Sequence, residues 1–460
     1  MIPNNSPWIQ QLKRTRPVVP LEADAHADVA IVGGGIAGAV TAFFTLRDTD
    51  KSVILFEADK VAHGATGHNA GQIASYFERP LSELVEEFGL ELAIDGQRSV
   101  ESAWALIDQI VAEAGLRTPL YRFTGYTGLS TLDQVILHLK DNRCRVDGGL
   151  QNETLIVAEE WMERKDIPGE YRDLYGTVPQ KDILNLLETN STDYIASLAF
   201  QKGCMNSALF TEELIGYLIT KYQDRFSFYE GSPVKTVRLK EHTATLEVLG
   251  HTVEVGKVVL CTNGFEHFSI INEAGQDIDT EFHHSIAGRI GYMSGYVEPF
   301  DNPPVAVSYF PRTNERIGDP TGESYFYLTR RPYESDSKSF HSLVCAGGPE
   351  KVLPSGADYS PSHSCSEDTR DSIDDFLRSN YSKHPGPETE YAFCWHGLMG
   401  YTPSGIRRVG PEPCNPTLLY NLGCNGVGIL PSVFGGKRIS EFLGGKQVKP
   451  SLFDPHDQRV

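Results

Sequence analysis

Three shortages in the sequence narrow what this protein can be. Its 460 residues contain no run that approaches the roughly 18 apolar residues of a membrane span. Its 8 cysteines form no CxxC pair and no cysteine–histidine cluster with zinc spacing. Basic residues are also scarce, 41 against 61 acidic ones, which gives a net charge of −20. We therefore expect no membrane span, no metal site and no nucleic-acid partner, because an acidic surface repels phosphate backbones.

The rest of the composition indicates an ordinary globular enzyme-sized protein. Hydrophobic residues make up 40% and charged residues 22% of the chain, as in soluble proteins. A chain of this length exceeds one ordinary core, so we expect two domains. Residues 1–20 carry Lys13, Arg14 and Arg16 with no apolar stretch behind them, which argues against a signal peptide. Scattered thiols fit a reducing compartment, and we expect a cytoplasmic location.

The most informative segment runs from Asp28 to Gly38 and reads DVAIVGGGIAG. We expect residues 29–32 to form a buried strand, residues 36–47 a helix and residues 53–56 a second strand. Glycines at the turn let the backbone approach a pyrophosphate, and Gly38 lets the helix pack closely on the sheet. Glu57 follows the second strand, where a carboxylate accepts ribose hydroxyls. The order of strand, glycines, helix, second strand and acidic residue predicts a dinucleotide site. The alternative is a glycine-rich turn with no ligand.

Two further glycine-rich segments could supply backbone N–H groups to the same ligand. Residues 64–72 read GATGHNAGQ, and residues 421–436 lead from an expected strand over 418–422 through dense glycines into a helix. Helix N-termini with free amides favour negative charge. NAD needs one such cradle, whereas three suit the longer FAD. No second GxGxxG motif follows a strand, although an NAD(P)H-dependent flavin reductase commonly has one.

The rest of the chain is predicted by periodicity and turn residues. We expect an N-terminal arm over 1–27, pinned by Trp8, and one or two helices over 81–114 that end at Gly115. Other expected elements are short strands and helices over 117–200, a helix over 212–222, a strand over 227–237, a hairpin of 244–249 and 251–255, a strand over 257–264, strands within 285–350, a loop over 353–368 and a helix over 369–380.

Taken in order, these motifs resemble those of glycine/D-amino-acid oxidase (DAO)-type FAD-dependent oxidoreductases, most of all the gamma-glutamylputrescine oxidase-like members. The matching stretches are the arm around Trp8, residues 28–38 with Glu57, residues 64–72, Pro233-Val234, and residues 258–264, 395–410 and 423–436. The resemblance implies an α/β fold with a Rossmann-like FAD/NAD(P)-binding domain and an inserted antiparallel-sheet substrate domain, of the DAO/glutathione-reductase-2 type. It assigns 1–27 to an arm, 28–80, 200–270 and 391–460 to the FAD-binding domain, and 81–199 and 271–390 to the substrate or cap domain.

The resemblance also implies a set of FAD-binding residues. The first glycines would contact the pyrophosphate, Glu57 the adenosine ribose, Val234 the adenine side, and residues 426–428 the pyrimidine edge of the flavin. The whole set is Gly33, Gly35, Ile36, Ala37, Gly38, Glu57, Ala58, Gly64, Ala65, Thr66, His68, Asn69, Gly71, Gln72, Val234, Thr262, Asn263, Gly264, Gly400, Gly426, Val427 and Gly428. We expect the FAD to be noncovalent, while a covalent bond through His68 is left open.

The implied reaction is hydride transfer from the α-carbon of a small amine or amino acid to flavin N5, after which water hydrolyses the imine. The electron acceptor is left open between molecular oxygen and another acceptor. The candidate catalytic or substrate-holding residues are Trp395, His396, Tyr325, Tyr327, Arg289 and Arg330, with Arg331 as a neighbour. On an alternating strand Tyr325 and Tyr327 share one face and Arg330 the other, so only one set can face the flavin. The plainer alternatives are surface charge for the arginines and sheet packing for the tyrosines.

Two other functions compete with amine oxidation at this point. One is an FAD-dependent dehydrogenase of a hydroxy acid or polyol, which reduction of the flavin by alcohols alone would reveal. The other is a flavin-bearing subunit of a larger electron-transfer assembly, which no small molecule would reduce.

Overall fold

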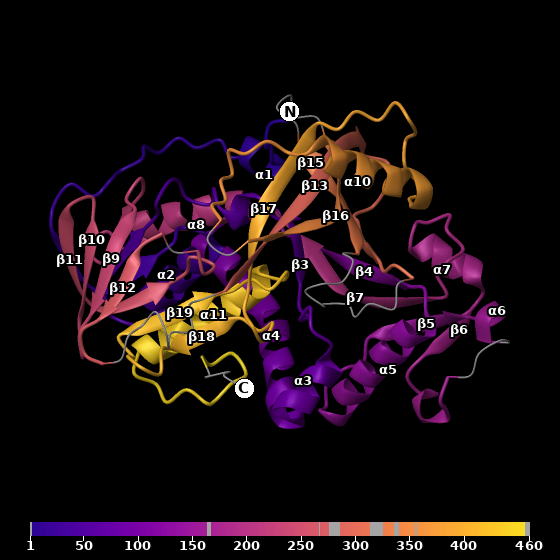
Figure 1. The fold of residues 1–460 in the computed structure, drawn as a ribbon, viewed down its shortest axis with the longest axis horizontal. Coiled ribbons are helices and arrows are strands. Elements are labelled where there is room, and N and C mark those ends of the chain that lie inside the picture. The colour runs from indigo at the N-terminus through magenta and orange to yellow at the C-terminus, as the bar shows by residue number, and fades with distance from the viewer. Residues whose placement is uncertain are drawn as a thin grey trace.

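The fold consists of two large sheets with helices packed around them (Figure 1). The computed structural model describes residues 2–162, 167–265, 267–275, 286–312, 325–334, 340–354 and 357–455. Within these residues, one sheet has nine strands and the other has ten. In Figure 1 the first sheet lies on the left, and the second extends across the centre to the right.

The first sheet has a parallel centre in the order β8-β2-β1-β11-β19. Its strands are β1 (Ala25–Val32), β2 (Val53–Phe56), β8 (Phe226–Tyr229), β9 (Val234–Leu239), β10 (Ala244–Val248), β11 (His251–Leu260), β12 (Ser269–Asn272), β18 (Arg408–Pro411) and β19 (Leu418–Leu422). Antiparallel pairing joins β10 to β11 and to β9. The predicted hairpin is therefore present, and its second strand continues without a break into the predicted strand over 257–264.

Apolar side chains on both faces explain why β1 lies in the middle of this sheet. Val29 and Ile31 belong to one buried cluster, whereas Ala30 and Val32 belong to another on the opposite face. A strand that is apolar on both faces is typical of a covered parallel sheet. The first cluster contains residues of α2 (Ile36–Asp48), α3 (Leu81–Phe88), α4 (Leu90–Ala114), α8 (Ser207–Lys221) and α11 (Ile429–Leu443).

The second sheet is mostly antiparallel and follows the order β17-β13-β16-β15-β14-β4-β7-β5-β6, with β3 added beside β7. Its strands are β3 (Gln72–Ala74), β4 (Tyr121–Leu129), β5 (Thr154–Ala158), β6 (Gly176–Val178), β7 (Ala196–Cys204), β13 (Ala287–Pro299), β14 (Val305–Tyr309), β15 (Phe326–Glu334), β16 (Phe340–Leu353) and β17 (Phe393–Tyr401). The remaining helices of four or more residues in the described part of the chain are α1 (Pro7–Gln10), α5 (Leu132–Asp147), α6 (Glu159–Met162), α7 (Gln180–Leu186) and α10 (Glu367–Asn380).

The structure differs from the sequence predictions in three respects. The strand expected over 227–237 is two strands, because the chain turns at Gly231, where φ is +58°, between β8 and β9. Helices α3 and α4 fall in the segment assigned to the substrate domain, yet they pack into the core of the first sheet. Strand β17 falls in a segment assigned to the FAD-binding domain, yet it pairs with β13 in the second sheet. The first difference is a local turn at a glycine, whereas the other two arise from packing and pairing between segments distant in sequence.

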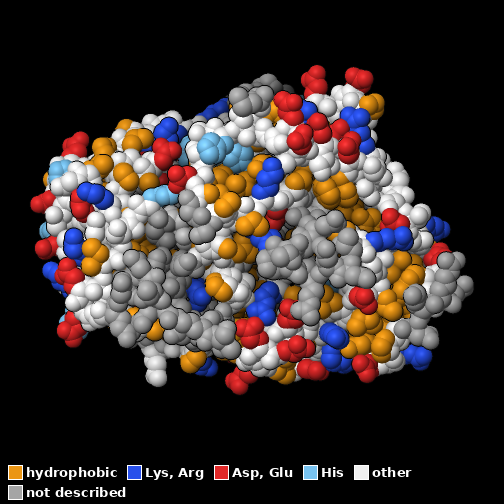
Figure 2. Space-filling view, in the orientation of Figure 1, with side chains coloured by type: hydrophobic (Ala, Val, Ile, Leu, Met, Phe, Trp, Pro, Cys, Tyr) orange, Lys and Arg blue, Asp and Glu red, His pale blue; other side chains and the backbone are white. Residues whose placement is uncertain are grey.

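The described surface agrees with the acidic composition. Exposed acids Glu367, Asp368, Asp371 and Asp375 lie on α10, and acidic side chains gather at the top right of Figure 2, where Figure 1 places this helix. Among the described helices, none is both long and apolar enough to cross a membrane. In the same residues, no group of three histidine, cysteine or acidic side chains is placed to hold a metal ion.

Candidate active site

A cavity of about 470 Å³ lies between the two sheets and receives residues from both. From the predicted cofactor set it is lined by Gly33, Gly35, Ile36, Ala37, Glu57, Ala58, Gly64, Ala65, Thr66, His68, Asn69, Gln72, Val234, Thr262, Asn263, Gly426, Val427 and Gly428. Segments hundreds of residues apart in sequence therefore meet around one space. The other four predicted residues do not line the cavity: Gly38, Gly71, Gly264 and Gly400.

The first glycine turn brings a helix end to this cavity. Gly33 has φ +112°, and its N–H donates to the carbonyl of Phe56 at 2.8 Å. A Cβ atom at Gly38 would overlap the carbonyl oxygen of Gly33, so only glycine permits this approach of α2 to the turn. Helix α2 starts at Ile36, and its N-cap residue, Gly35, has no side chain to cap it. The Thr66 hydroxyl accepts from the first amide, that of Ile36, and the amides that follow it in the first turn are available to a negatively charged group.

Glu57 is held at the cavity by two backbone amides. Its Oε2 accepts a hydrogen bond from the N–H of Gly34 at 2.7 Å, and its Oε1 accepts one from the N–H of Asp59 at 3.0 Å. Burial raises the pKa of the Glu57 carboxyl, although these amide bonds act in the opposite direction. Each carboxylate oxygen keeps a lone pair that a hydroxyl group could use.

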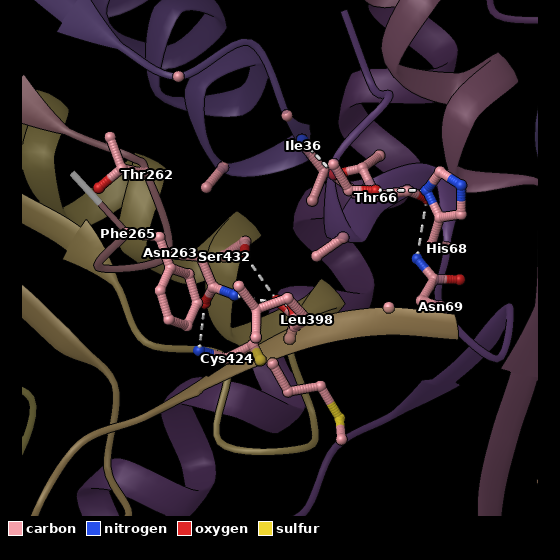
Figure 3. Close-up of a pocket in the computed structure, with 18 of the residues that line it drawn as sticks. Ile36, Thr66, His68, Asn69, Thr262, Asn263, Phe265, Leu398, Cys424 and Ser432 are labelled. Carbon is pink, nitrogen blue, oxygen red and sulfur yellow. Dashed lines mark hydrogen bonds between the residues drawn. The ribbon is translucent and has the colours of Figure 1, made fainter. Parts of the chain in front are cut away.

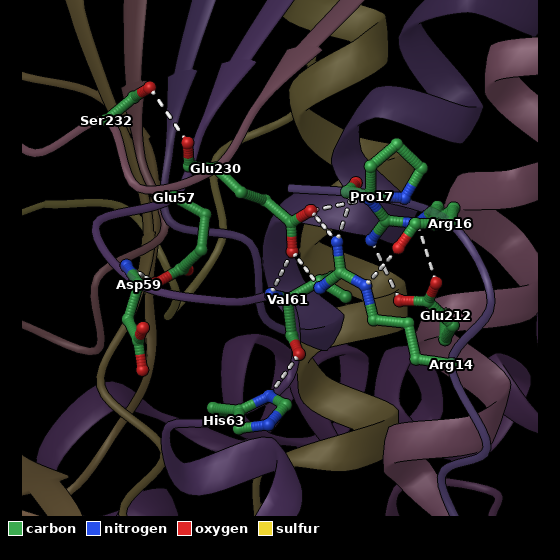
Figure 4. A network of polar contacts seen from close by, with 10 residues as sticks. All are labelled: Arg14, Arg16, Pro17, Glu57, Asp59, Val61, His63, Glu212, Glu230 and Ser232. Carbon is green, nitrogen blue, oxygen red and sulfur yellow. Dashed lines mark hydrogen bonds and ion pairs between the residues drawn. The ribbon is translucent and has the colours of Figure 1, made fainter. Parts of the chain in front are cut away.

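An ion-pair network ties the N-terminal arm to the loop after Glu57 (Figure 4). Glu230, 1% exposed, binds Arg14 and also Arg16, the latter at 2.5 Å. The other carboxylate oxygen accepts from the N–H of Val61 at 2.7 Å. Burial acts to raise the pKa of Glu230, and the bonds from both arginines outweigh it and lower that pKa. The arm thus supports the loop that carries Glu57, a connection that the sequence did not predict.

The second glycine-rich segment is a compact loop (Figure 3). Thr66 accepts from the N–H of Ile36 at 3.0 Å through its hydroxyl, which fixes the loop against the start of α2. Asn69 donates to the Thr66 carbonyl at 3.0 Å. The Nδ1 atom of His68 donates to the carbonyl of Gly64 at 3.0 Å, and burial lowers the pKa of this histidine. The ring is therefore held by the backbone of its own loop.

The C-terminal turn meets the strand end of β11 through one side chain. Asn263, with φ +60°, accepts from the N–H of Cys424 at 2.9 Å, as Figure 3 shows. Gly426 has φ +78°, and α11 starts at Ile429 without a side-chain cap. A second helix N-terminus thus faces the same cavity. Together with the first turn, this arrangement fits a dinucleotide with an extended ring system.

The remaining wall is aromatic and acidic. Tyr325 and Tyr327 line it as one face of the strand, as the alternation allowed. Five residues of this wall were not predicted: Tyr76, Glu78, Met293, Glu350 and Tyr401. The Tyr325 hydroxyl donates to Glu78 at 3.2 Å. No local sequence pattern marks these residues, because they come from separate segments that only the tertiary fold joins.

The structure places four of the six predicted catalytic side chains outside the cavity wall. Trp395 is 0% exposed, packs edge-on against Trp8 with ring centres 6.2 Å apart, and donates to the Asn69 carbonyl at 3.1 Å. His396 is buried between the Tyr359 hydroxyl at 3.0 Å and the His363 carbonyl at 2.9 Å. Both side chains thus support the site from behind.

The predicted arginines are also absent from the cavity lining. Arg289 pairs with Glu350 at 3.5 Å. Arg330 is 0% exposed and bonds Glu188 at 2.7 and 2.8 Å, so this placement revises its predicted contact with substrate. Its strand alternates, and the side chain falls in the core opposite the cavity. Arg331 stacks on the Trp8 ring at 4.6 Å.

Comparison with known proteins agrees with this geometry. The model of the family described as FAD dependent oxidoreductase (DAO) matches residues 28–442. A putative Rieske 2Fe-2S iron–sulfur protein of Bacillus subtilis is 21% identical over 302 residues, which are 65% of this chain and 52% of that protein. The gamma-glutamylputrescine oxidoreductase of Escherichia coli is 30% identical over 77 residues, 17% of this chain and 18% of that protein. The chain thus matches about half the length of the first curated relative and under a fifth of the second.

Solved structures share the fold over nearly the whole chain. Glycine oxidase from Geobacillus kaustophilus has a TM-score of 0.64 at 15% identity, and the match covers 95% of this chain and 100% of that one. L-proline dehydrogenase from P. horikoshii has a TM-score of 0.65 at 14% identity, with coverage of 95% and 98%. At these identities the similarity establishes the architecture predicted from the sequence, an FAD-binding domain joined to an antiparallel substrate sheet.

Proposed function

The chain belongs to the DAO family of FAD-dependent oxidoreductases, and on this basis we propose that it oxidises a carbon–nitrogen bond of a small amine or amino acid. The observation that carries the proposal is that one cavity joins the glycine cradles to a wall of tyrosines and carboxylates. Similarity to the gamma-glutamylputrescine oxidoreductase supports an amine as the substrate. We further propose a cytoplasmic enzyme that passes electrons to molecular oxygen or another acceptor.

Residues from both sheets would hold FAD in this cavity. We assign the pyrophosphate to the turn at Gly33 and Gly35, and the adenosine ribose to the Glu57 carboxylate. The bound cofactor supplies the hydride acceptor for the reaction. The start of α11 after Gly428 provides a positive dipole end that favours negative charge beside it.

An amine must be uncharged before it can lose a hydride from its α-carbon. Glu78 lines the cavity, and burial raises its pKa to about 7. A carboxylate with that pKa can accept the proton of an ammonium group at neutral pH. The Tyr325 hydroxyl, 3.2 Å away, orients the carboxylate for this role.

Anaerobic mixing of the FAD-loaded protein with amines, amino acids and hydroxy acids tests the proposal. We expect flavin absorbance near its visible maximum to fall with at least one amine or amino acid. Bleaching by hydroxy acids alone would refute it in favour of the dehydrogenase alternative. We propose that FAD is noncovalent, so acid precipitation should leave yellow colour in the supernatant; colour retained in the pellet would indicate a bond to His68.

The role of Glu57 can be tested without turnover. Hydrogen bonds to charged groups contribute about 1.5–3 kcal/mol, so Glu57→Gln should weaken FAD binding about 10- to 100-fold. Titration of the apoprotein with FAD, followed by quenching of flavin fluorescence, measures this change. Asp59→Asn removes the same charge from an exposed neighbour that does not line the cavity. Equal FAD affinity in both variants would contradict the assignment.

A further inference from the structure

Two carboxylates line the cavity while their basic partners are not among its lining residues. Glu78 and Glu350 line the cavity. Arg289 approaches Glu350 at 3.5 Å, and the charge of Lys202 acts to lower the pKa of Glu78, although burial has the larger effect and raises it. Neither cation lines the cavity. Lys202 is 0% exposed and donates to Gln72 at 3.1 Å and to Ser308 at 3.4 Å. Among the described residues, the cavity lining therefore includes these two acids and not their basic partners.

Tyrosine rings surround the same carboxylates. Tyr76, Tyr325, Tyr327 and Tyr401 all line the cavity. The rings of Tyr325 and Tyr327 lie 5.8 Å apart at an angle of 58°. The faces of aromatic rings attract cations, especially where water is excluded. Carboxylate oxygens and ring faces in one wall form a combination suited to an alkylammonium group.

The described cavity wall offers little to a substrate carboxylate. Among the lining residues that the structure describes, Arg407 is the only lysine or arginine. Its Nε donates to the Asn421 side chain at 2.6 Å, and its Nη2 donates to the Asn421 carbonyl at 2.7 Å. These bonds hold the guanidinium in the C-terminal turn. A carboxylate placed near Glu78 would be repelled, because like charges in a poorly solvated site interact strongly.

We infer that this region selects a substrate whose reacting end is a simple alkylammonium group, as in a mono- or diamine, rather than an α-amino acid. The inference rests on the proposed function, since it specifies the substrate of the same site. Glu78 contacts the ammonium directly, and Glu350 adds a second negative charge. The cationic head lies among the tyrosine rings, and the carbon chain follows the apolar part of the wall at Met293.

Binding of unreactive probes to the FAD-loaded protein tests the inference apart from turnover. Butyltrimethylammonium and butanoate have matched chains and opposite charges, and isothermal titration calorimetry at pH 7.5 measures their Kd values. We expect the cation to bind at least tenfold more tightly than butanoate. Glu78→Gln should raise the Kd of the cation at least tenfold. Tighter binding of butanoate, or an unchanged Kd in Glu78→Gln, would overturn the inference.

Matched variants separate recognition from folding. Glu153 is another internal carboxylate, whose pKa burial raises to about 7, but it lines a neighbouring cavity of about 100 Å³ instead. Glu153→Gln should leave the Kd of the cation within twofold, whereas Glu350→Gln should raise it. If Glu153→Gln and Glu78→Gln weakened binding of the cation equally, the effect would come from the net negative charge of this region and not from contact with Glu78. That result would refute the inference. If the cation binds as expected but no amine bleaches the flavin, the proposed function fails while the recognition site stands.

Discussion

Replacing Arg330 with methionine distinguishes a structural arginine from a catalytic one. The side chain is 0% exposed and makes two bonds to Glu188, one to the Tyr381 hydroxyl at 2.5 Å and one to the Pro303 carbonyl at 3.0 Å. Removing one partner of a buried ion pair costs about 3–5 kcal/mol, since the other charge stays buried. Lys383 still contacts Glu188 at 2.5 Å. The expected loss in unfolding free energy is therefore near the lower limit, about 3 kcal/mol.

The loss translates into a modest thermal shift because the chain is long. An unfolding entropy of about 2.1 cal/mol/K per residue gives about 1 kcal/mol/K for 460 residues, so Tm should fall by about 3 °C. Differential scanning calorimetry and urea unfolding of the FAD-loaded protein measure both quantities. Since Arg330 lies behind the cavity wall, kcat/KM for a reducing amine should change less than threefold.

Controls sharpen this comparison. Lys383→Met removes the exposed partner of Glu188, and a partly exposed ion pair of this kind contributes below about 1 kcal/mol. The double variant Arg330→Met/Glu188→Leu should recover part of the stability lost in the single variant, because no buried charge is left unpaired. An Arg330→Met protein with unchanged Tm and kcat/KM lowered a hundredfold would refute the structural reading.

Two other predictions concern the glycine turn and acid stability. Gly38→Ala should abolish FAD retention, measured by flavin absorbance after gel filtration, since the added Cβ would overlap the carbonyl oxygen of Gly33. The control is Gly216→Ala in α8, where an added Cβ has nothing within 4 Å. This variant should retain FAD and gain up to about 1 kcal/mol of unfolding free energy. Burial acts to raise the pKa of Glu188, but bonds from its basic partners lower it below 4.5. Its stabilising contribution is thus complete above pH 4.5 and disappears as the pH falls through the lowered value. Urea unfolding between pH 7 and 3 should show a shallower acid loss for Glu188→Gln than for the parent; parallel curves would contradict this.

Most of the residues predicted to bind the cofactor line one cavity, and the sequence signals that pointed to them are local. The strand, glycines and helix of residues 28–38 are contiguous. An added Cβ at Gly33 or Gly38 would overlap a backbone carbonyl oxygen, and one at Gly34 or Gly35 would meet a side chain that follows later in the sequence. Alternation along β15 also predicted that Tyr325 and Arg330 would lie on opposite faces. It could not tell which face meets the cavity, because that depends on the strands and helices packed on each side.

What the sequence determined by itself is the dinucleotide turn, its helix and the family to which the chain belongs, since these depend on short-range backbone geometry. Only the tertiary structure decided that Glu78 and Glu350, 272 positions apart, share one wall with the tyrosines. It also decided that Arg330 is neutralised by Glu188 within the core, and that Arg14 and Arg16 support the Glu57 loop through Glu230. Charges acquire their roles from the partners and solvent around them, and those are set only when distant segments pack together.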